Sequence, residues 1–239
     1  MLIFGKNPVK EALKTKQNID SILVLKSKTD VYKDILTLTR KSNIKVFIKE
    51  IDYFKSRLRD NVHQGIAAEI ENVKNIQTVY PDKDAKFLVI ADAIEDPMNM
   101  GAIIRSSVLF GVDGIIMIEH KTCGITPSVI KASSGALFHQ NIYIVSNIVN
   151  TMKKLKKDNY WLYGLDMETD KDINKISLIK NEKVILIIGS EGKGMHKLTR
   201  ENCDFVIKIP TTEKIDSLNA SNAATIAMWE FYKRINGLI

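Results

Sequence analysis

The sequence contains few cysteines and prolines. Its 239 residues include two cysteines, Cys123 and Cys203, which lie far apart and form no CxxC motif. Disulfide frameworks and thiolate metal sites need several cysteines at close spacing, so the sequence excludes both classes. We expect two ordinary buried thiols in a reducing compartment. Five prolines leave most segments able to form regular helices and strands.

A histidine metal site is not indicated either. The four histidines show no metal-ligand spacing with each other or with the cysteines; they are His63, His120, His139 and His196. Zinc sites place their ligands at short, regular intervals. We therefore expect no bound metal.

Long apolar runs are also missing. No stretch of about 18 uncharged apolar residues is present, which argues against a membrane span. Residues 1–6 lack the basic segment and apolar core of a signal peptide. We therefore expect a cytoplasmic protein with no membrane partner. The hydrophobic fraction of 45% is enough for a buried core, and the length favours two structural units.

Positive charge is in excess and is unevenly distributed. The formal net charge is +7, and residues 1–84 hold 16 Lys and Arg against 11 Asp and Glu. Residues 85–239 hold 19 against 17. The front segment therefore carries most of the excess. Charge alone leaves two interpretations open, a polyanionic partner or a solvated basic surface.

The front segment alternates helix and strand patterns. Asn7-Pro8 is a plausible start for a first helix, with Asn7 as the N-cap. Apolar runs predict strands at 21–25, 45–48 and 66–70, with helices between them. Residues 1–71 are thus predicted to form a small α/β domain. Residues 72–85 are polar and contain a proline, so we interpret them as a linker.

Residues 86–239 repeat a strand and helix pattern typical of a parallel sheet. Strands are predicted at 87–91, 114–118, 142–145, 160–165 and 184–188, and helices at 99–110, 126–133, 147–157 and 218–235. Helices on both faces would bury these apolar strands, and Trp161 and Trp229 are expected to be buried too. In such folds ligands bind beyond the carboxyl ends of the strands.

Unusual residues follow two of these strands. In residues 96–107, Asn99 is a candidate helix cap, and Arg105 can present a guanidinium to a phosphate. In residues 187–195, three glycines form a loop that permits close backbone approach to a ligand, and Glu191 is a candidate polar ligand. This loop matches neither a Walker A nor a GxGxxG pattern, so a dinucleotide-binding dehydrogenase is excluded.

A third segment joins the end of a strand to the last helix. Ile209-Pro210 ends the strand, and the helix is predicted to open at Ser217 or Asn219. Capping needs only one polar side chain, but this helix start has four. They are Ser217, Asn219, Ser221 and Asn222. Free backbone N–H groups also point outward there.

Together these three segments resemble the ordered motifs of the SpoU/TrmH family of RNA ribose methyltransferases. The matching stretches are Asn-x-Gly-Ala-Ile-x-Arg (99–105), Gly-Ser-Glu-Gly-x-Gly (189–194) and Ser-Leu-Asn-x-Ser-x-Ala (217–223), with Ile209-Pro210 before the last. Residues 5–13 and 63–68 are similar to the ribosomal-protein-like RNA-binding domain of the RlmB-type branch, which methylates a guanosine ribose in 23S rRNA.

The resemblance implies a fold, a cofactor and a set of site residues. The fold is a SPOUT-type catalytic domain over 86–239 with a C-terminal trefoil knot, preceded by an RNA-binding domain over 1–71, and the enzyme is a homodimer. S-adenosylmethionine is implied as the cofactor. Its implied binding residues are Leu165, Gly189, Glu191, Gly192, Ile209, Ser217, Leu218 and Asn219. The implied catalytic residues are Asn99, Arg105, Glu191, Ser217 and Asn219.

The sequence departs from the family pattern at four positions. Thr211 and Glu213 stand where the family usually has Met and Gly, and Phe138 and Asn141 stand where Glu and Pro are frequent. Thr211 and Glu213 lie in the loop before Ser217, and the resemblance implies that the region of Phe138 and Asn141 borders the RNA. The implied catalytic residues are intact. Two alternatives to the 23S rRNA enzyme stay open: a tRNA 2′-O-methyltransferase, and a non-catalytic RNA-binding protein.

Overall fold

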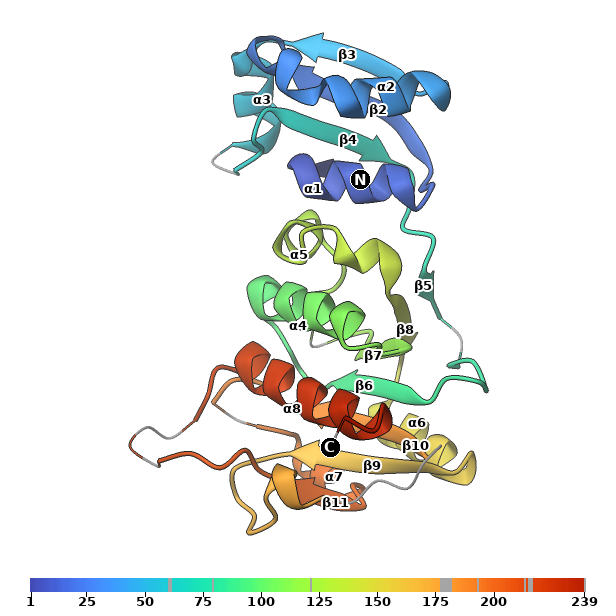
Figure 1. The fold of residues 1–239 in the computed structure, drawn as a ribbon, viewed down its shortest axis with the longest axis vertical. Coiled ribbons are helices and arrows are strands. Elements are labelled where there is room, and N and C mark those ends of the chain that lie inside the picture. The colour runs from blue at the N-terminus through green and yellow to red at the C-terminus, as the bar shows by residue number, and fades with distance from the viewer. Residues whose placement is uncertain are drawn as a thin grey trace. The chain divides into compact units, whose positions relative to one another are not determined.

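A computed structural model describes residues 1–59, 62–78, 80–120, 122–176, 182–192, 194–212, 214 and 217–238 of the chain (Figure 1). It divides into two compact units, and each is an α/β assembly with its own sheet. Unit 1 comprises residues 1–75 and 125–139, and unit 2 comprises residues 76–124 and 140–239. The expected α/β class is confirmed in both.

Unit 1 is built on a four-stranded mixed sheet in the order β1-β4-β2-β3. Strands β2 and β3 pair in parallel, and the other pairs are antiparallel. Its strands are β1 (Leu2–Phe4), β2 (Ile19–Leu25), β3 (Lys45–Lys49) and β4 (Ile66–Ile70), and its α-helices are α1 (Lys6–Lys14), α2 (Lys33–Lys41), α3 (Ile51–Leu58) and α5 (Pro127–Ala132). Short 3-10 turns are η1 (Lys26–Lys28), η2 (Asp30–Tyr32) and η3 (Ala136–His139).

The predicted start of the first helix is wrong. Helix α1 begins at Lys6, and its N-cap is Gly5 with a φ of 99°, a left-handed conformation that favours glycine. The Gln64 side chain accepts a 2.9 Å hydrogen bond from the backbone N–H of Lys6. A residue 58 positions away therefore satisfies one of the free N–H groups at the helix start, and no local cap residue is needed.

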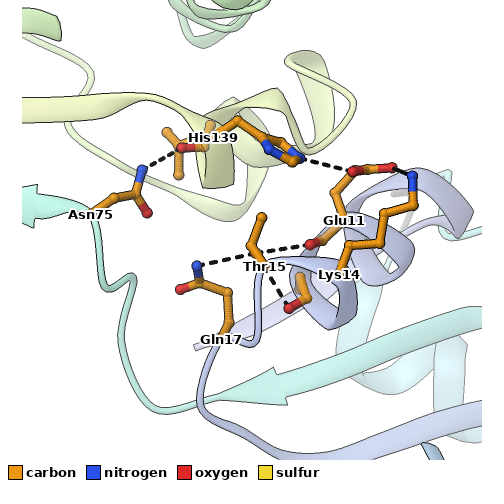
Figure 2. Close-up of polar contacts among 8 residues, drawn as sticks. Glu11, Lys14, Thr15, Gln17, Asn75 and His139 are labelled. Atoms are coloured by element: carbon orange, nitrogen blue, oxygen red, sulfur yellow. Dashed lines mark hydrogen bonds and ion pairs between the residues drawn. The ribbon is translucent and has the colours of Figure 1, made fainter. Parts of the chain in front are cut away.

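Residues 125–139 group with unit 1 although they lie inside the range 86–239 expected for the second domain. Helix α5 packs on β1 and α1. Figure 2 shows two polar contacts of this segment: His139 Nε2 lies 2.8 Å from a Glu11 carboxylate oxygen, and the Asn75 amide donates to the Leu137 carbonyl. The domain boundaries 1–71, 72–85 and 86–239 stay a prediction.

Unit 2 is built on a seven-stranded sheet in the order β11-β9-β10-β6-β7-β8-β5, and neighbouring strands pair in parallel throughout its described residues. Its strands are β5 (Ile76–Gln77), β6 (Phe87–Ala91), β7 (Gly114–Ile118), β8 (Asn141–Val145), β9 (Tyr160–Leu165), β10 (Lys183–Ile188) and β11 (Phe205–Ile207). Its helices are α4 (Pro97–Leu109), α6 (Ile148–Lys157), α7 (Lys197–Glu201) and α8 (Ala220–Ile235), with the 3-10 turn η4 (Ile173–Lys175). The expected linker contains β5, which pairs with β8.

The sheet of unit 2 is covered on both faces, as predicted. Alternate residues of β6 point to opposite faces: Leu88 and Ile90 pack with α6, while Phe87 stacks on Phe231 of α8 at 5.7 Å between ring centroids. Helices α4 and α8 pack against each other (Figure 1). Because β6 and β10 are neighbours in parallel, the segments that follow them emerge at the same sheet edge.

Candidate functional site

A cavity of about 570 Å³ lies at the carboxyl ends of β9 and β10 in unit 2. Four parts of the chain line it: residues 165–168 at the end of β9, the glycine loop after β10, two residues of α7, and five residues between the end of β11 and the first turn of α8. The α7 residues are Lys197 and Arg200, and the last five are Ile209, Ser217, Leu218, Ala220 and Ala223. We define the glycine loop as residues 189–195, of which Lys193 lies outside the described residues. A volume of this size is within the range of about 300–1,000 Å³ found for small-molecule sites.

The glycine loop folds back on itself. The backbone N–H groups of Ser190 and Gly194 each donate to the other residue's carbonyl at 3.0 Å. A Cβ on Gly189 would lie 2.2 Å from the Gly194 carbonyl carbon and 2.3 Å from the Met195 nitrogen. Only glycine fits at position 189. Gly192 has a φ of 79° and open space around it, so its role is to permit the turn.

Asn99 is not the cap of α4, so that prediction is wrong. Asp96 is the cap, and its carboxylate accepts from the backbone N–H groups of Met98 at 3.0 Å and Asn99 at 3.3 Å. Pro97 occupies the first turn, where its missing N–H costs nothing. Asn99 therefore lies in the first turn of α4, and its side chain is not used for capping.

Asn99 links the loop after β10 to the start of α8. Its Nδ2 donates to Glu191 Oε2 at 3.0 Å, and its Oδ1 accepts from Asn219 Nδ2 at 2.9 Å. Of the two helix starts predicted, Ser217 and Asn219, it is Asn219 that caps α8, by accepting from the N–H groups of Ser221 and Asn222. The chain of contacts Glu191–Asn99–Asn219 thus joins three sequence segments at the rim of the cavity.

Most of the implied cofactor residues line the cavity. They are Leu165, Gly189, Glu191, Gly192, Ile209, Ser217 and Leu218. Among the described residues, Asn219 is not a lining residue, and it contacts the site through Asn99 instead.

The four positions that depart from the family pattern lie in different places. Thr211 is exposed, and Glu213 lies outside the described residues. Phe138 is buried in unit 1, and Asn141 opens β8.

Arg105 is exposed on α4 and does not line the cavity. It follows Asn99 by six residues, so the two Cα atoms are about 9 Å apart along the helix axis. Leu109, four residues further on, lies on the same face of α4. The structure therefore brings together four of the five implied catalytic residues around the cavity rim and leaves Arg105 on a neighbouring surface.

Sequence reasoning missed a charged pair in the cavity wall. Arg200 Nε donates to the Asp166 carboxylate at 3.2 Å, and Arg200 Nη2 donates to the Glu168 carbonyl at 2.6 Å. All three residues line the cavity. Asp166 directly follows the strand at 160–165, so the rule that ligands bind at strand carboxyl ends could have found it.

The described parts of the chain give no support for a metal site or for a reactive thiol. No group of three or more His, Cys, Asp or Glu residues there could hold a metal ion. Burial raises the pKa of Cys123 to about 11 and that of Cys203 to about 12, so neither thiol ionises near neutral pH. Among the same described residues, no helix is both long enough and apolar enough to cross a bilayer.

Comparison with known families shows to which family the chain belongs. The model of the SpoU rRNA Methylase family matches residues 86–229, and the model described as RNA 2′-O ribose methyltransferase substrate binding matches residues 2–75. The chain belongs to the SpoU/TrmH family of RNA methyltransferases. The glycine loop and the Glu191–Asn99–Asn219 contacts both lie within the SpoU match.

Individual relatives agree with this family. A protein of Staphylococcus saprophyticus, whose name assigns it to the TrmH family of tRNA/rRNA methyltransferases, is 34% identical over 99% of this chain and 96% of its own length. The SpoU methyltransferase AviRb of Streptomyces viridochromogenes, solved with AdoMet, has a TM-score of 0.83 at 23% identity over 99% of this chain and 91% of its own. An AdoMet-bound rRNA methyltransferase of Sinorhizobium meliloti has a TM-score of 0.78 at 19% identity, over 98% and 86%. At these identities the two structures support the fold. The trefoil knot stays a prediction.

Proposed function

We propose that this protein transfers a methyl group from S-adenosylmethionine to a ribose 2′-hydroxyl of RNA, and that its target is a guanosine of 23S rRNA. The observation that carries the proposal is the Glu191–Asn99–Asn219 contact chain at the rim of a cavity large enough for the cofactor. Family membership supports RNA as the substrate class.

The donor set of the cavity fits S-adenosylmethionine. Leu165, Ile209 and Leu218 offer apolar surface for the adenine, and the glycine loop allows backbone contacts. Glu191 is a carboxylate at the rim that favours a neighbouring positive charge. Gly189, Gly192, Ser217 and Asn219 complete the proposed cofactor site. When bound, the cofactor supplies a methyl group activated by its sulfonium.

The remaining chemistry concerns the 2′-hydroxyl, which must be oriented and must lose a proton. Glu191 is held by Asn99, so its carboxylate is pre-oriented at the rim. We assign Arg105 to the RNA phosphate and to the negative charge that develops on the 2′-oxygen, because a guanidinium with a pKa above about 12 is a poor base. Asn219 fixes Asn99 through its amide, and Ser217 contributes a hydroxyl to the cavity lining.

The role of Arg105 is tested with Arg105→Lys. Lysine keeps the charge but loses the planar, bidentate donor geometry. We expect turnover to fall at least tenfold while cofactor affinity is unchanged, with the rate measured from pH 6 to pH 10. Near-normal turnover would contradict an essential guanidinium.

The substrate is tested by incubating the protein with labelled S-adenosylmethionine and separated rRNA and tRNA pools. We expect label in the 23S rRNA, at the ribose of one guanosine. Label only in tRNA would favour the tRNA enzyme, for which the relatives' names also leave room. Cofactor binding without label in either pool would indicate a non-catalytic RNA-binding protein.

We further propose that the protein acts as a homodimer in the cytoplasm. Unit 2 presents exposed apolar side chains on α4 and α8, with Leu109 68% and Trp229 43% exposed. The rings of Phe110, Trp229 and Tyr232 pack against one another there, with centroid distances of 5.6–6.0 Å. A second copy of the chain would cover this surface.

A further inference from the structure

Asp92 is a buried carboxylate between the end of strand β6 and the glycine loop. It directly follows β6 and is 3% exposed. One of its oxygens accepts from the backbone N–H of His196 at 2.9 Å, and the other lies 2.8 Å from His196 Nδ1. Its own backbone N–H donates to the Ile188 carbonyl at 2.8 Å. Asp92 therefore contacts both the residue before the glycine loop and the residue after it.

The contact with His196 fixes the end at which the glycine loop returns to the sheet. Met195, just before His196, is buried in the core and also lines the cavity. The loop already crosses itself tightly at Gly189, where no side chain fits. A shift of His196 would therefore displace Met195 and the cavity wall.

The backbone directly after Asp92 is strained. Ala93 has a φ of 59°, a left-handed conformation that is unfavourable for alanine, and it is buried. Such strain persists only where the surroundings determine the conformation. The turn at Ala93 lets the chain leave β6 immediately after Asp92 instead of continuing the strand.

We propose that Asp92 is a positioning residue for the cofactor site, which acts through His196 to hold the glycine loop against the cavity. Asp92 is not among the described residues that line the cavity, so its effect is indirect. The inference rests on the proposed function, since it takes the cavity as the S-adenosylmethionine site. Partners that orient a binding group commonly change affinity by about 10–100-fold when they are removed.

The test compares Asp92→Ala, Asp92→Asn and His196→Ala in the full chain. Asp92→Ala should raise the Kd for S-adenosylmethionine at least tenfold while the KM for RNA stays the same. Asp92→Asn should restore most of the affinity, because the amide oxygen still accepts from the His196 N–H and the amide nitrogen can donate to Nδ1. His196→Ala, which keeps the backbone contact, should give an intermediate loss.

Asp113→Ala is the matched control. The Asp113 carboxylate accepts from the N–H groups of Lys86 and Phe87, at 2.7 and 2.9 Å, at the opposite end of β6. Its loss should lower the melting temperature without changing the Kd for the cofactor. An Asp92→Ala protein with unchanged Kd, or an Asp92→Asn protein as weak as Asp92→Ala, would overturn the proposal.

Hydrogen exchange of the cofactor-free protein separates this inference from the proposed function. The Gly194 and His196 amides, which donate to Ser190 and Asp92, should exchange faster in Asp92→Ala and at the normal rate in Asp113→Ala. A wild-type protein that binds no S-adenosylmethionine would refute the proposed function. Unchanged exchange in Asp92→Ala would refute the positioning role.

Discussion

At the scale of single residues, Asn99 uses both ends of its side-chain amide. Its Nδ2 donates to Glu191 and its Oδ1 accepts from Asn219, and the residue is 6% exposed. A carboxylate has no hydrogen to donate to Glu191, so an amide is the side chain that fits between a carboxylate and another amide. Asn99 is available for this role because Asp96 caps α4 in its place.

Replacing Asn99 with Ala should affect both activity and stability. Glu191 and Asn219 would each lose a partner at a partly buried site, which costs about 1–2 kcal/mol in unfolding free energy. Loss of the carboxylate orientation should lower kcat about 100-fold. Methyl transfer and urea unfolding measure the two effects.

Ser106→Ala is the control for Asn99→Ala. The Ser106 hydroxyl lies 2.7 Å from the Thr225 hydroxyl and also joins α4 to α8, but it is not a cavity residue. Its loss should change stability by a similar amount and leave kcat nearly unchanged. Equal kcat values for the two variants would mean that Asn99 only holds the helices together.

At the scale of elements, the strands of unit 2 were predictable because each is a continuous apolar run. Those predicted at 87–91, 114–118 and 160–165 have the observed bounds. The short β5 was missed because two residues carry no periodicity.

The prediction that Trp161 and Trp229 are buried is wrong, since the two residues are 44% and 43% exposed. Apolar character alone does not tell which face of an element is covered.

The glycine loop predicts the outcome of Gly189→Ala. The new Cβ would meet backbone atoms at 2.2 and 2.3 Å, and backbone cannot rotate away as a flexible side chain can. We expect a loss of about 1–3 kcal/mol in unfolding free energy and no measurable cofactor binding by calorimetry. Gly192→Ala is the control, because it meets nothing within 4 Å. It should cost about 1–2 kcal/mol through its positive φ and keep a measurable affinity.

The contact between α1 and η3 in unit 1 predicts a pH dependence (Figure 2). Burial would raise the pKa of Glu11, but hydrogen bonds with Lys14 and His139 outweigh it and hold the pKa below its ordinary value of 4.5. A lowered folded-state pKa stabilises the protein above the unfolded pKa, and this stabilisation is lost as pH falls through the folded value. Glu11→Gln should therefore melt below wild type at pH 7.

The difference between the two melting temperatures should shrink as pH falls below 4.5 and vanish once Glu11 is protonated. Thermal unfolding from pH 3 to pH 7 measures it. Glu71→Gln, an exposed acid of the same unit, is the control. A gap for Glu11→Gln that stays constant over the whole pH range would contradict the lowered pKa.

At the scale of the whole molecule, the exposed apolar surface of α4 and α8 predicts the effect of Leu109→Glu on assembly. A charge at this 68% exposed position should leave the fold of unit 2 intact and prevent burial against a second copy. Sedimentation should show a dimer for wild type and a monomer for the variant. Leu198→Glu on α7, at a position 62% exposed, should remain dimeric. A monomeric wild type would refute the homodimer.

The chain crosses between the two units three times, at 75–76, 124–125 and 139–140. A single linker over 72–85 would give one crossing. The grouping of residues 125–139 with unit 1 was not predictable, because α5 and η3 have ordinary helical patterns. Their contacts with α1 and β1 involve residues more than a hundred positions away.

The sequence by itself determined the α/β class, the parallel sheet of unit 2 and the three motifs that indicate the SpoU/TrmH family. These depend on local apolar runs and on short ordered motifs, which are read along the chain. Only the tertiary structure decided which side chains meet. Glu191 and Asn99 are 92 residues apart, and Asp92 and His196 are 104 apart. They come together because β6 and β10 are parallel neighbours whose ends meet at one sheet edge, and that pairing is set by packing of the whole unit.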